Sequence, residues 1–203
     1  MKKILVIIAV FISTASFAQR SFWAFNYHMS FGAGEQGDFI ADGSFRGFSI
    51  DGRGFLNQNM SIGGSFSWEV FDQIYRDIPP QQLDTGIGNV SGAITGVQYR
   101  FLNTLPILVN AHYYLGTHDA IRPYFGLGIG TAYTEQRTDI GLVSIIGNGW
   151  GFAVQPEVGV VIPFGLTGVG ANVSGKFRYT TKSGDTTIPV SFFTLAVGIA
   201  FVN

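Results

Sequence analysis

His28 and Ser30 are the two residues whose types and spacing could support nucleophilic chemistry. They stand two positions apart in SFWAFNYHMSFG, so in an extended strand both side chains point to the same face. A histidine can take the proton of a serine hydroxyl, but such a pair normally relies on a third, acidic group that orients the imidazole. No acidic residue nearby in the sequence is an evident third member, so the pair alone is a weak indication of catalysis.

A second set of ionisable residues lies on the polar side of segments in which polar and apolar residues alternate. The set consists of Asp51, Arg53, Glu69, Arg100, His112, Glu157, Lys176 and Arg178. Inside a closed sheet these residues could form an ion path or a ligand site, or they could pair with one another and fill the interior. We favour a structural network, because eight strands enclose room for side chains only. Glu157 with Lys176 or Arg178 is the expected pair, since these residues stand on consecutive segments.

No motif in the sequence indicates a metal or cofactor site. The three histidines, His28, His112 and His118, lack the spacing of metal motifs. Three aspartates between residues 72 and 84 could bind a calcium ion, but a solvated loop explains them better. We therefore expect no catalytic residue, no cofactor and no metal.

The first residues, MKKILVIIAVFISTASFAQR, have the organisation of a secretory signal peptide. Two lysines precede a run of nine apolar residues, and Ser16-Phe17-Ala18 is a small-x-small cleavage site. The apolar run is too short for a membrane-spanning helix, which needs ~20 residues. We expect cleavage before Gln19, with residues 1–18 as the leader and residues 19–203 as one exported domain.

The composition is too apolar for a typical soluble domain. Charged residues make up 12% of the chain, against ~25% in soluble domains, whereas aromatic residues reach 15% and glycines number 28. After the leader no apolar run approaches the length of a spanning helix, so only a closed barrel of strands could satisfy the backbone in lipid. Without the two leader lysines the chain has ten basic and thirteen acidic residues, which argues against nucleic acid as a partner. The absence of cysteine excludes disulfides.

Eight segments show the period of two that is typical of strands with one apolar face. They cover residues 21–32, 48–54, 60–70, 93–115, 123–133, 151–163, 169–180 and 191–203. The first is the clearest, because Trp23, Phe25 and Tyr27 alternate with small or polar residues. The segment 93–115 exceeds the ~9 to 11 residues that a crossing needs, so its first half should project beyond the bilayer.

The stretch PYFGLGIGTAY, residues 123–133, carries glycines at positions 126, 128 and 130. A dinucleotide-binding loop places its glycines between a strand and a helix, but no helical period follows Tyr133. We interpret the glycines as an inward-facing stripe that leaves space for long side chains from neighbouring strands.

Together these segments predict an all-β protein, an eight-stranded antiparallel up-and-down transmembrane β-barrel. A soluble barrel would need a charged outer face, but the polar face here is mostly Gly, Ser, Ala, Thr and Asn and suits the wall of a narrow lumen. With both termini on the periplasmic side, we expect three short turns and four longer external loops. The turns are predicted near residues 55–59, 116–120 and 164–168, and the loops near 34–43, 72–92, 136–148 and 181–187.

Two residues do not fit a regular strand. Arg46 shares the parity of Phe48 and Ile50 and would face lipid, so it should lie at the outer rim or beyond a register shift. Pro156 lies inside a predicted strand and removes a ladder hydrogen bond, so we expect a bulge or weakened pairing there.

The run LPILVNAHYYLGTHDAIRPYFGLGIGTAYTE, residues 105–135, resembles the central hairpin of small bacterial outer-membrane barrels of the OmpW and OmpX kind. In that pattern an apolar strand ends in an aromatic pair, here Tyr113-Tyr114, and a short turn leads to an Arg-Pro-Tyr-x-Gly-x-Gly strand, here residues 122–128. The resemblance extends to the mature chain through the strand count and Phe201 near the end. It implies location in the bacterial outer membrane, contact with its lipid and lipopolysaccharide, and insertion by the barrel assembly machinery, and it supplies no catalytic residues.

We therefore expect a monomeric barrel, not an enzyme, with a structural, envelope-integrity or surface-interaction role carried by its external loops. The alternative is a narrow OmpW-like conduit or binding protein for small hydrophobic molecules. A third possibility is a lipid A-modifying enzyme, since outer-membrane lipid A deacylases carry a His-x-Ser pair on a barrel strand. Their pair faces lipid, however, whereas His28 and Ser30 have the parity of the lumen.

Overall fold

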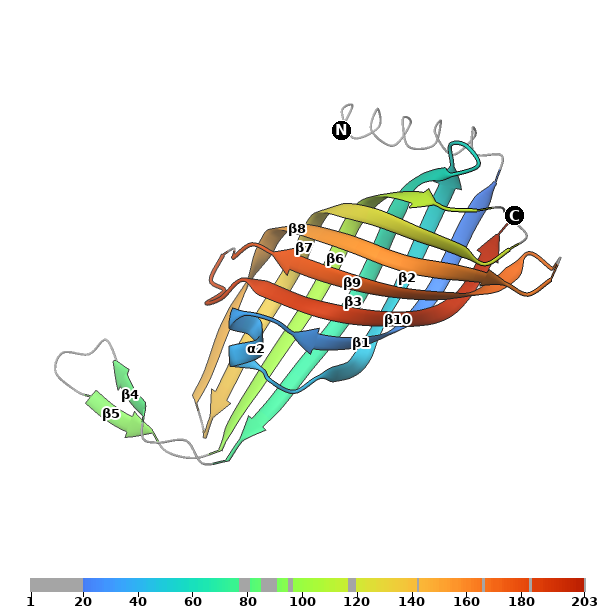
Figure 1. Cartoon of the computed structure of the whole chain (residues 1–203). Helices are drawn as coiled ribbons and strands as arrows, with labels where there is room; N and C mark the ends of the chain where they lie inside the picture. The colour runs from blue at the N-terminus through green and yellow to red at the C-terminus, as the bar shows by residue number, and fades with distance from the viewer. Residues whose placement is uncertain are drawn as a thin grey trace, which may run out of the picture.

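The computed structural model describes residues 20–76, 81–84, 91–94, 97–116, 120–141, 143–165, 167–182 and 184–202; the predicted leader lies outside them. Within this part of the chain eight strands close into an antiparallel barrel in the order β1-β10-β9-β8-β7-β6-β3-β2 (Figure 1). They are β1 Ser21–Gly32, β2 Ser44–Phe55, β3 Met60–Tyr75, β6 Gln98–Tyr114, β7 Arg122–Ile140, β8 Val143–Pro163, β9 Val169–Thr180 and β10 Val190–Val202. The predicted all-β, up-and-down barrel is confirmed.

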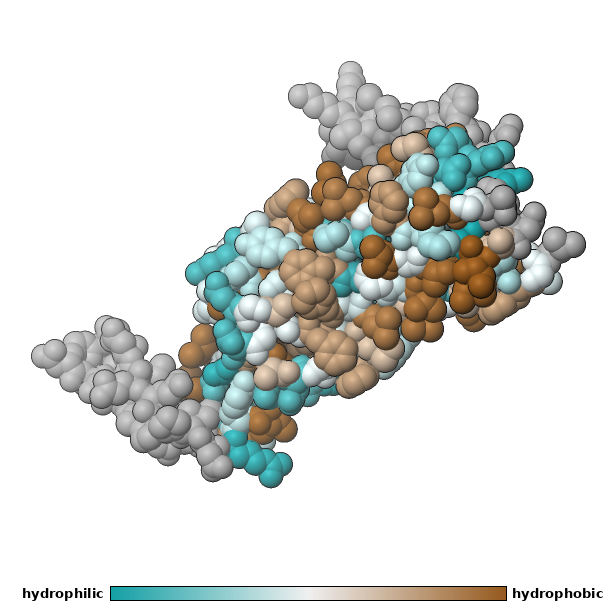
Figure 2. Space-filling view, viewed as in Figure 1, coloured by the Kyte–Doolittle hydropathy of each residue, from teal (hydrophilic) through white to brown (hydrophobic). Residues whose placement is uncertain are grey.

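The outer wall of the barrel is apolar and its interior is polar, as the alternation predicted. On β1, Trp23, Phe25 and Tyr27 are each about half exposed, whereas Asn26 and His28 are buried. Figure 2 shows hydrophobic side chains spread over the side of the barrel, with hydrophilic residues gathered toward its ends. A barrel in water would have the opposite distribution, so this wall suits lipid.

Four adjacent strands are much longer than the other four. β3, β6, β7 and β8 have 16, 17, 19 and 21 residues, whereas β1, β2 and β9 have 12 and β10 has 13. The long strands extend together past one end of the barrel (Figure 1), and we call this extension the projecting sheet. It consists of residues 70–75 of β3, 98–104 of β6, 134–140 of β7 and 143–149 of β8.

The predicted loop at residues 136–148 is wrong, because these residues continue β7 and β8 and meet in a tight turn at Gly141. Gly141 adopts a φ of 59°, a left-handed conformation that glycine accepts without strain. The sequence does not reveal these strands, because the outward positions of β7 here carry Glu135, Arg137 and Asp139 in place of apolar residues. The chain between β1 and β2 contains a short helix, α2 Glu35–Phe39. The chain between β3 and β6 contains a hairpin of two short strands, β4 Gln81–Asp84 and β5 Ser91–Ile94.

The end of the barrel that carries the C-terminus has short connections. β1 begins and β10 ends at this end, where Phe22 pairs with Val202. The described connections there are residues 56–59, the residues flanking 117–119, and the residues flanking 166, which agrees with the three predicted turns. No helix in the described part of the chain has the length and apolar character that crossing a membrane requires.

The two irregular residues lie where the pairing departs from a regular ladder. β1 and β2 shift register between His28 and Ser30, and the extra β2 residue leaves both Phe45 and Arg46 exposed. Arg46 forms an ion pair with Asp72 of β3. The prediction that Arg46 lies at a register shift is confirmed.

Prolines interrupt the ladder without bending it. The pairing of β8 with β9 stops after Val154 and resumes at Glu157 in the same register. Pro156 lies in this gap because it has no N–H to donate. The predicted weakened pairing is therefore confirmed, without a bulge, and Pro106 of β6 lies in a similar gap in the pairing with β3.

The three glycines of β7 face the lumen, as predicted, while Phe125, Leu127 and Ile129 are half exposed on the outer wall. Gly126 is opposite His112, and a Cβ at Gly126 would lie 2.8 Å from Nε2 of that imidazole. The glycine stripe thus provides the space that the lumen side chains of β6 occupy.

We predict that Gly126→Ala destabilises the barrel by about 1–3 kcal/mol, because the methyl group would displace His112 from a closely packed interior. The measurement is the free energy of unfolding by urea in lipid vesicles. Gly175→Ala is the matched control, since Gly175 is on the outer wall and its Cβ would meet only Val158, at 4.0 Å. Equal stability of the two variants would contradict the lumen assignment of the stripe.

Candidate functional site

The carboxylate of Glu157 on β8 is the centre of a buried polar network in the lumen. Its Oε1 accepts hydrogen bonds from Tyr124 Oη at 2.7 Å and from Arg53 Nη2 at 3.3 Å. Its Oε2 lies 3.6 Å from His112 Nε2 and 3.9 Å from Lys176 Nζ. These partners come from β7, β2, β6 and β9, so a single carboxylate links five strands across the barrel.

Asp51 on β2 is a second anchor beside Glu157. Its Oδ2 accepts from Asn26 Nδ2 at 2.6 Å and lies 3.4 Å from Lys176 Nζ. Asn172 Nδ2 donates to Asn26 Oδ1 at 2.9 Å, and Asn172 Oδ1 lies 3.0 Å from Tyr124 Oη. Lys176 therefore lies between two carboxylates, which balances its charge in a place without bulk water.

A third anchor, Glu69 on β3, lies closer to the projecting sheet. Its Oε2 accepts from Arg178 Nη1 at 2.7 Å, and its Oε1 lies 2.8 Å from His28 Nδ1. The same guanidinium donates to Gln155 Oε1 through Nε at 2.9 Å and to Ser67 Oγ through Nη2 at 3.0 Å. Arg178 on β9 thus uses its planar guanidinium to bind three side chains on two other strands, β3 and β8, which a lysine could not do.

Ser49 joins these groups into one continuous network. Its Oγ lies 2.9 Å from His28 Nε2, 3.1 Å from Asn26 Nδ2 and 3.3 Å from Asp51 Oδ2. We call the whole set the lumen network. Its members are Asn26, His28, Ser49, Asp51, Arg53, Ser67, Glu69, His112, Tyr124, Gln155, Glu157, Asn172, Lys176 and Arg178.

Seven of the eight ionisable residues predicted for the lumen belong to this network, and Arg100 does not. Arg100 lies on the projecting sheet, where Nη1 donates to the carbonyl of Phe39 at 2.8 Å. Its guanidinium stands 4.5 Å from the centre of the Tyr75 ring. Arg100 has the parity of the lumen, but β6 extends so far beyond the barrel that Arg100 contacts α2 and not the lumen network. The expected pair of Glu157 with Lys176 is present, whereas Arg178 pairs with Glu69.

Ser49, His28 and Glu69 stand in the order of a hydrolase triad, with spacings of 2.9 Å and 2.8 Å. The exposed fraction is 0% for His28 and Glu69 and 1% for Ser49, so the serine has no surface on which to meet an acyl substrate. Ser30 bonds to Thr194 at 2.8 Å instead of to the histidine. The arrangement therefore orients buried groups, and it lacks the lipid-facing position that the deacylase hypothesis requires.

An apolar plug covers the lumen network at the end with the projecting sheet. It consists of Ile40, Phe71, Leu102, Val190 and Phe192, with Phe39 packed against them. The chain around α2 folds across the mouth and brings Ile40 into this cluster (Figure 1). The guanidinium of Arg178 lies 5.1 Å from the centre of the Phe192 ring, so the plug rests directly on the network.

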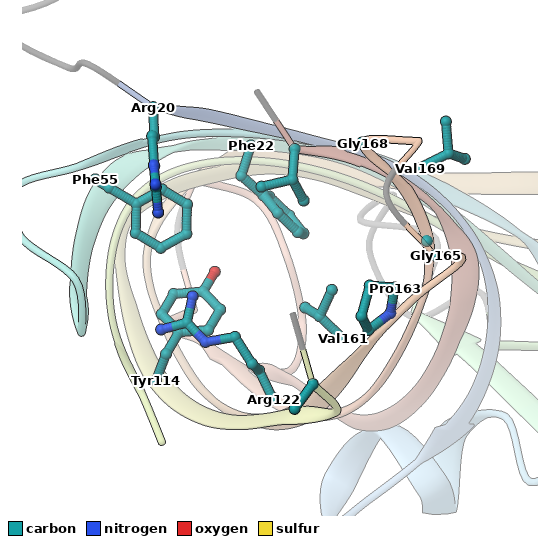
Figure 3. Close-up of a pocket in the computed structure, with 13 residues that line it drawn as sticks. Arg20, Phe22, Phe55, Tyr114, Arg122, Val161, Pro163, Gly165, Gly168 and Val169 are labelled. Atoms are coloured by element: carbon teal, nitrogen blue, oxygen red, sulfur yellow. The ribbon is translucent and has the colours of Figure 1, made fainter. Parts of the chain in front are cut away.

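At the opposite end the lumen opens into a vestibule of about 270 Å³ (Figure 3). Its floor is formed by Phe22, Phe55, Tyr114 and Val161, all buried. Arg53 lies behind this floor, with its guanidinium 4.7 Å from the centre of the Phe22 ring and Nη1 donating to Tyr114 Oη at 2.9 Å. The vestibule therefore ends at an aromatic layer that is backed by the network.

Sequence reasoning did not identify the neutral members of the network. Asn26, Ser49 and Tyr124 have lumen parity, but nothing in a neutral residue type indicates which buried charge it will contact. The sequence spacing pairs His28 with Ser30, whereas in the structure His28 contacts Ser49 and Glu69. In the described part of the chain no group of three or more His, Cys, Asp or Glu residues is placed to hold a metal ion.

Comparison with known proteins connects this geometry to a family. A family model described as outer membrane protein beta-barrel domain matches residues 4–201. The sequence matches none of the curated proteins with which it was compared.

Two similar solved structures have the same fold. The crystal structure of Neisserial surface protein A is 14% identical, with a TM-score of 0.52 over 90% of this chain and 95% of that chain. The crystal structure of OprG from Pseudomonas aeruginosa is 13% identical, with a TM-score of 0.52 over 92% and 96% of the two chains. At these identities the likeness concerns the fold alone.

We predict that Glu157→Ala lowers the free energy of unfolding by about 3–5 kcal/mol, because it leaves buried Arg53 and Lys176 without a shared carboxylate. Thermal melting in detergent and urea unfolding in lipid vesicles both measure the change. Glu135→Ala is the control, since Glu135 lies on the projecting sheet and outside the lumen network. An unchanged melting temperature for Glu157→Ala would show that the network does not stabilise the barrel.

Proposed function

We propose, from the premise that this chain belongs to the outer membrane protein beta-barrel domain family, that it is a sealed barrel which presents a binding surface outside the bacterial outer membrane. Export would use the leader predicted at residues 1–18, and insertion would use the barrel assembly machinery. In this proposal the barrel works as a monomer held by lipid and lipopolysaccharide, and it carries out no catalysis.

The observation that carries the proposal is an unprotected strand edge on the projecting sheet. The pairing of β8 with β9 begins at Ala153, and the loop after β9 packs against β8 as far as Gly147, where Asp185 and Thr186 lie. Among the described residues, 143–146 have no ladder partner on the β9 side. Strand edges in water are usually protected by charges, prolines or bulges, but the sequence here is VSII.

The side chains at this edge are apolar and accessible. Ile145 is 48% exposed and Ile146 is 53% exposed, and they point to opposite faces because they are consecutive in a strand. A partner strand could pair with the backbone of β8 through hydrogen bonds. The side chains on one face of that strand would cover Ile145, and those on its other face would cover Ile146. The geometry therefore favours an extended polypeptide segment with alternating apolar side chains as the partner.

The alternative function, a conduit for small hydrophobic molecules, is less well supported by the interior. A solute entering from outside would meet the apolar plug and then the lumen network, whose members come from seven of the eight barrel strands. Passage would require the buried ion pairs to separate, which costs several kcal/mol for each uncompensated charge.

We expect the purified barrel to give no steady conductance in planar lipid bilayers, because the plug and the network occupy the lumen in series. The comparison variant is Phe192→Ala combined with Phe71→Ala, which removes the two largest buried side chains of the plug without altering an ion pair and leaves the lumen network in place. Reproducible conductance of the unaltered barrel would support the conduit in place of the sealed barrel.

We expect the barrel in lipid nanodiscs to bind an immobilised unfolded polypeptide, for which reduced and carboxymethylated lactalbumin is the probe. Replacing Ile145 and Ile146 with lysine should weaken this binding at least tenfold, because charges on an edge oppose strand addition. Thr138→Lys is the matched control, since it adds a lysine to β7, which is paired on both sides. Equal binding by all three proteins, or none by the unaltered barrel, would remove the edge as a binding surface.

A further inference from the structure

The edge of β8 that lacks a ladder partner continues beyond the open residues 143–146. Among the described residues, 147–152 also have no ladder partner on the β9 side, because the pairing with β9 begins only at Ala153. Irregular chain lies there instead, and the N–H of Asp185 donates to the carbonyl of Asn148 at 3.1 Å. We call residues 184–188 the cover. The cover occupies a strand edge without being a strand.

The open part of the edge is short for strand addition. Backbone groups of alternate residues in a strand point to the same side, and the carbonyl of Asn148 points toward the cover. The backbone groups of Ser144 and Ile146 therefore point to that side as well, so the open edge offers two residues to a partner strand. A strand of the usual ~5–6 residues would also need Asn148, whose carbonyl the cover occupies.

The face of β8 beneath the cover has no side chains where the cover approaches it. Gly147 and Gly151 have no room for a Cβ, which would overlap the carbonyl of Asp185 at the first position and that of Thr181 at the second. Glycine within a strand commonly marks such a close approach of another backbone. These two glycines therefore form a seat for the chain that follows β9.

Gln136 of β7 holds the cover on this seat. It is buried and lies opposite Gly147 in the pairing of β7 with β8. Its Oε1 accepts hydrogen bonds from the N–H of Thr187 at 2.9 Å and from Thr187 Oγ1 at 2.8 Å. Its Nε2 donates to the carbonyl of Ile188 at 2.9 Å. A single side chain therefore makes several of the contacts that fix the cover.

The cover has little apolar anchorage of its own. Gly184, Asp185 and Thr187 are exposed, and Ile188 lies outside the apolar plug, whose next member along the chain is Val190. Segments with few buried apolar contacts are those that open most readily in a folded protein. A strand that paired with β8 would also replace the hydrogen bond from Asp185 with its own.

We propose that the cover regulates the binding surface at this edge by competing with the partner strand for β8. When the cover leaves, the edge available for pairing lengthens from residues 143–146 to include Asn148. The inference rests on the proposed function, because the cover competes only if a partner binds at the edge.

The test fixes the cover with a disulfide, which the absence of native cysteine allows. Asn148→Cys combined with Asp185→Cys places two thiols on neighbouring, hydrogen-bonded backbones, a separation that a disulfide can span. The measurement is binding of reduced and carboxymethylated lactalbumin to the barrel in lipid nanodiscs. We expect the oxidised form to bind at least tenfold more weakly than the same protein after treatment with dithiothreitol. Asp185→Cys alone is the control and should bind equally under both conditions.

Gln136→Met tests the same competition in the opposite direction. Methionine has a similar volume but cannot make the hydrogen bonds, so the cover should loosen and the probe should bind about tenfold more tightly. Gln98→Met is the matched control and should leave binding unchanged, since Gln98 is a buried glutamine of the projecting sheet that bonds to Arg100 and not to the cover. If Gln136→Met does not fold, the disulfide decides alone.

The results separate this inference from the proposed function. If the oxidised and reduced forms bind the probe equally, the binding surface stands and the competition is overturned. If neither these forms nor the unaltered barrel binds the probe, the surface itself is removed, and its regulation with it.

Discussion

The buried carboxylate of Glu157 is the interaction on which the interior of this barrel depends. A strand that faces lipid on one side sends its polar side chains to the other, and in a narrow barrel these must meet each other. A buried ion is tolerated only when its charge and its hydrogen bonds are satisfied. Glu157 meets this condition for Arg53 and Lys176 together, and it does so from the middle of β8. The apolar exterior and the paired interior are therefore two consequences of one membrane-adapted wall.

The filled lumen separates two structurally different ends of the molecule. At one end the plug closes the mouth, and the four long strands continue outward as the projecting sheet. At the other end the network is capped by an aromatic floor, which leaves a shallow vestibule bordered by arginines. The lumen network lies between the plug and the aromatic floor and separates the two ends.

The sequence was sufficient to predict the barrel, since the parity of residues such as Trp23 and Asn26 indicated which face meets lipid. The glycine stripe at residues 126–130 was placed correctly for the same reason. The projecting sheet was missed because charged residues, Glu135, Arg137 and Asp139, occupy the outward face of β7 there, so no lipid-facing alternation marks the strand. The partners within the lumen were also out of reach, because the pairing of Arg178 with Glu69 depends on strand stagger around the barrel. Parity gives the face of a residue and not its height along the axis, which is why Arg100 was grouped with the network.

The most direct test of the sealed lumen uses the absence of native cysteine, which allows single thiols to be introduced. Ser49→Cys reports on the middle of the network, Val202→Cys on the vestibule and Ser144→Cys on the projecting sheet. The measurement is the rate at which a small cationic methanethiosulfonate reagent modifies each thiol in the membrane-inserted barrel. A sealed lumen predicts rapid modification of the cysteines at 144 and 202 and protection of the one at 49 for as long as the barrel stays folded. Rapid modification at position 49 would show a continuous water path through the barrel and contradict the account.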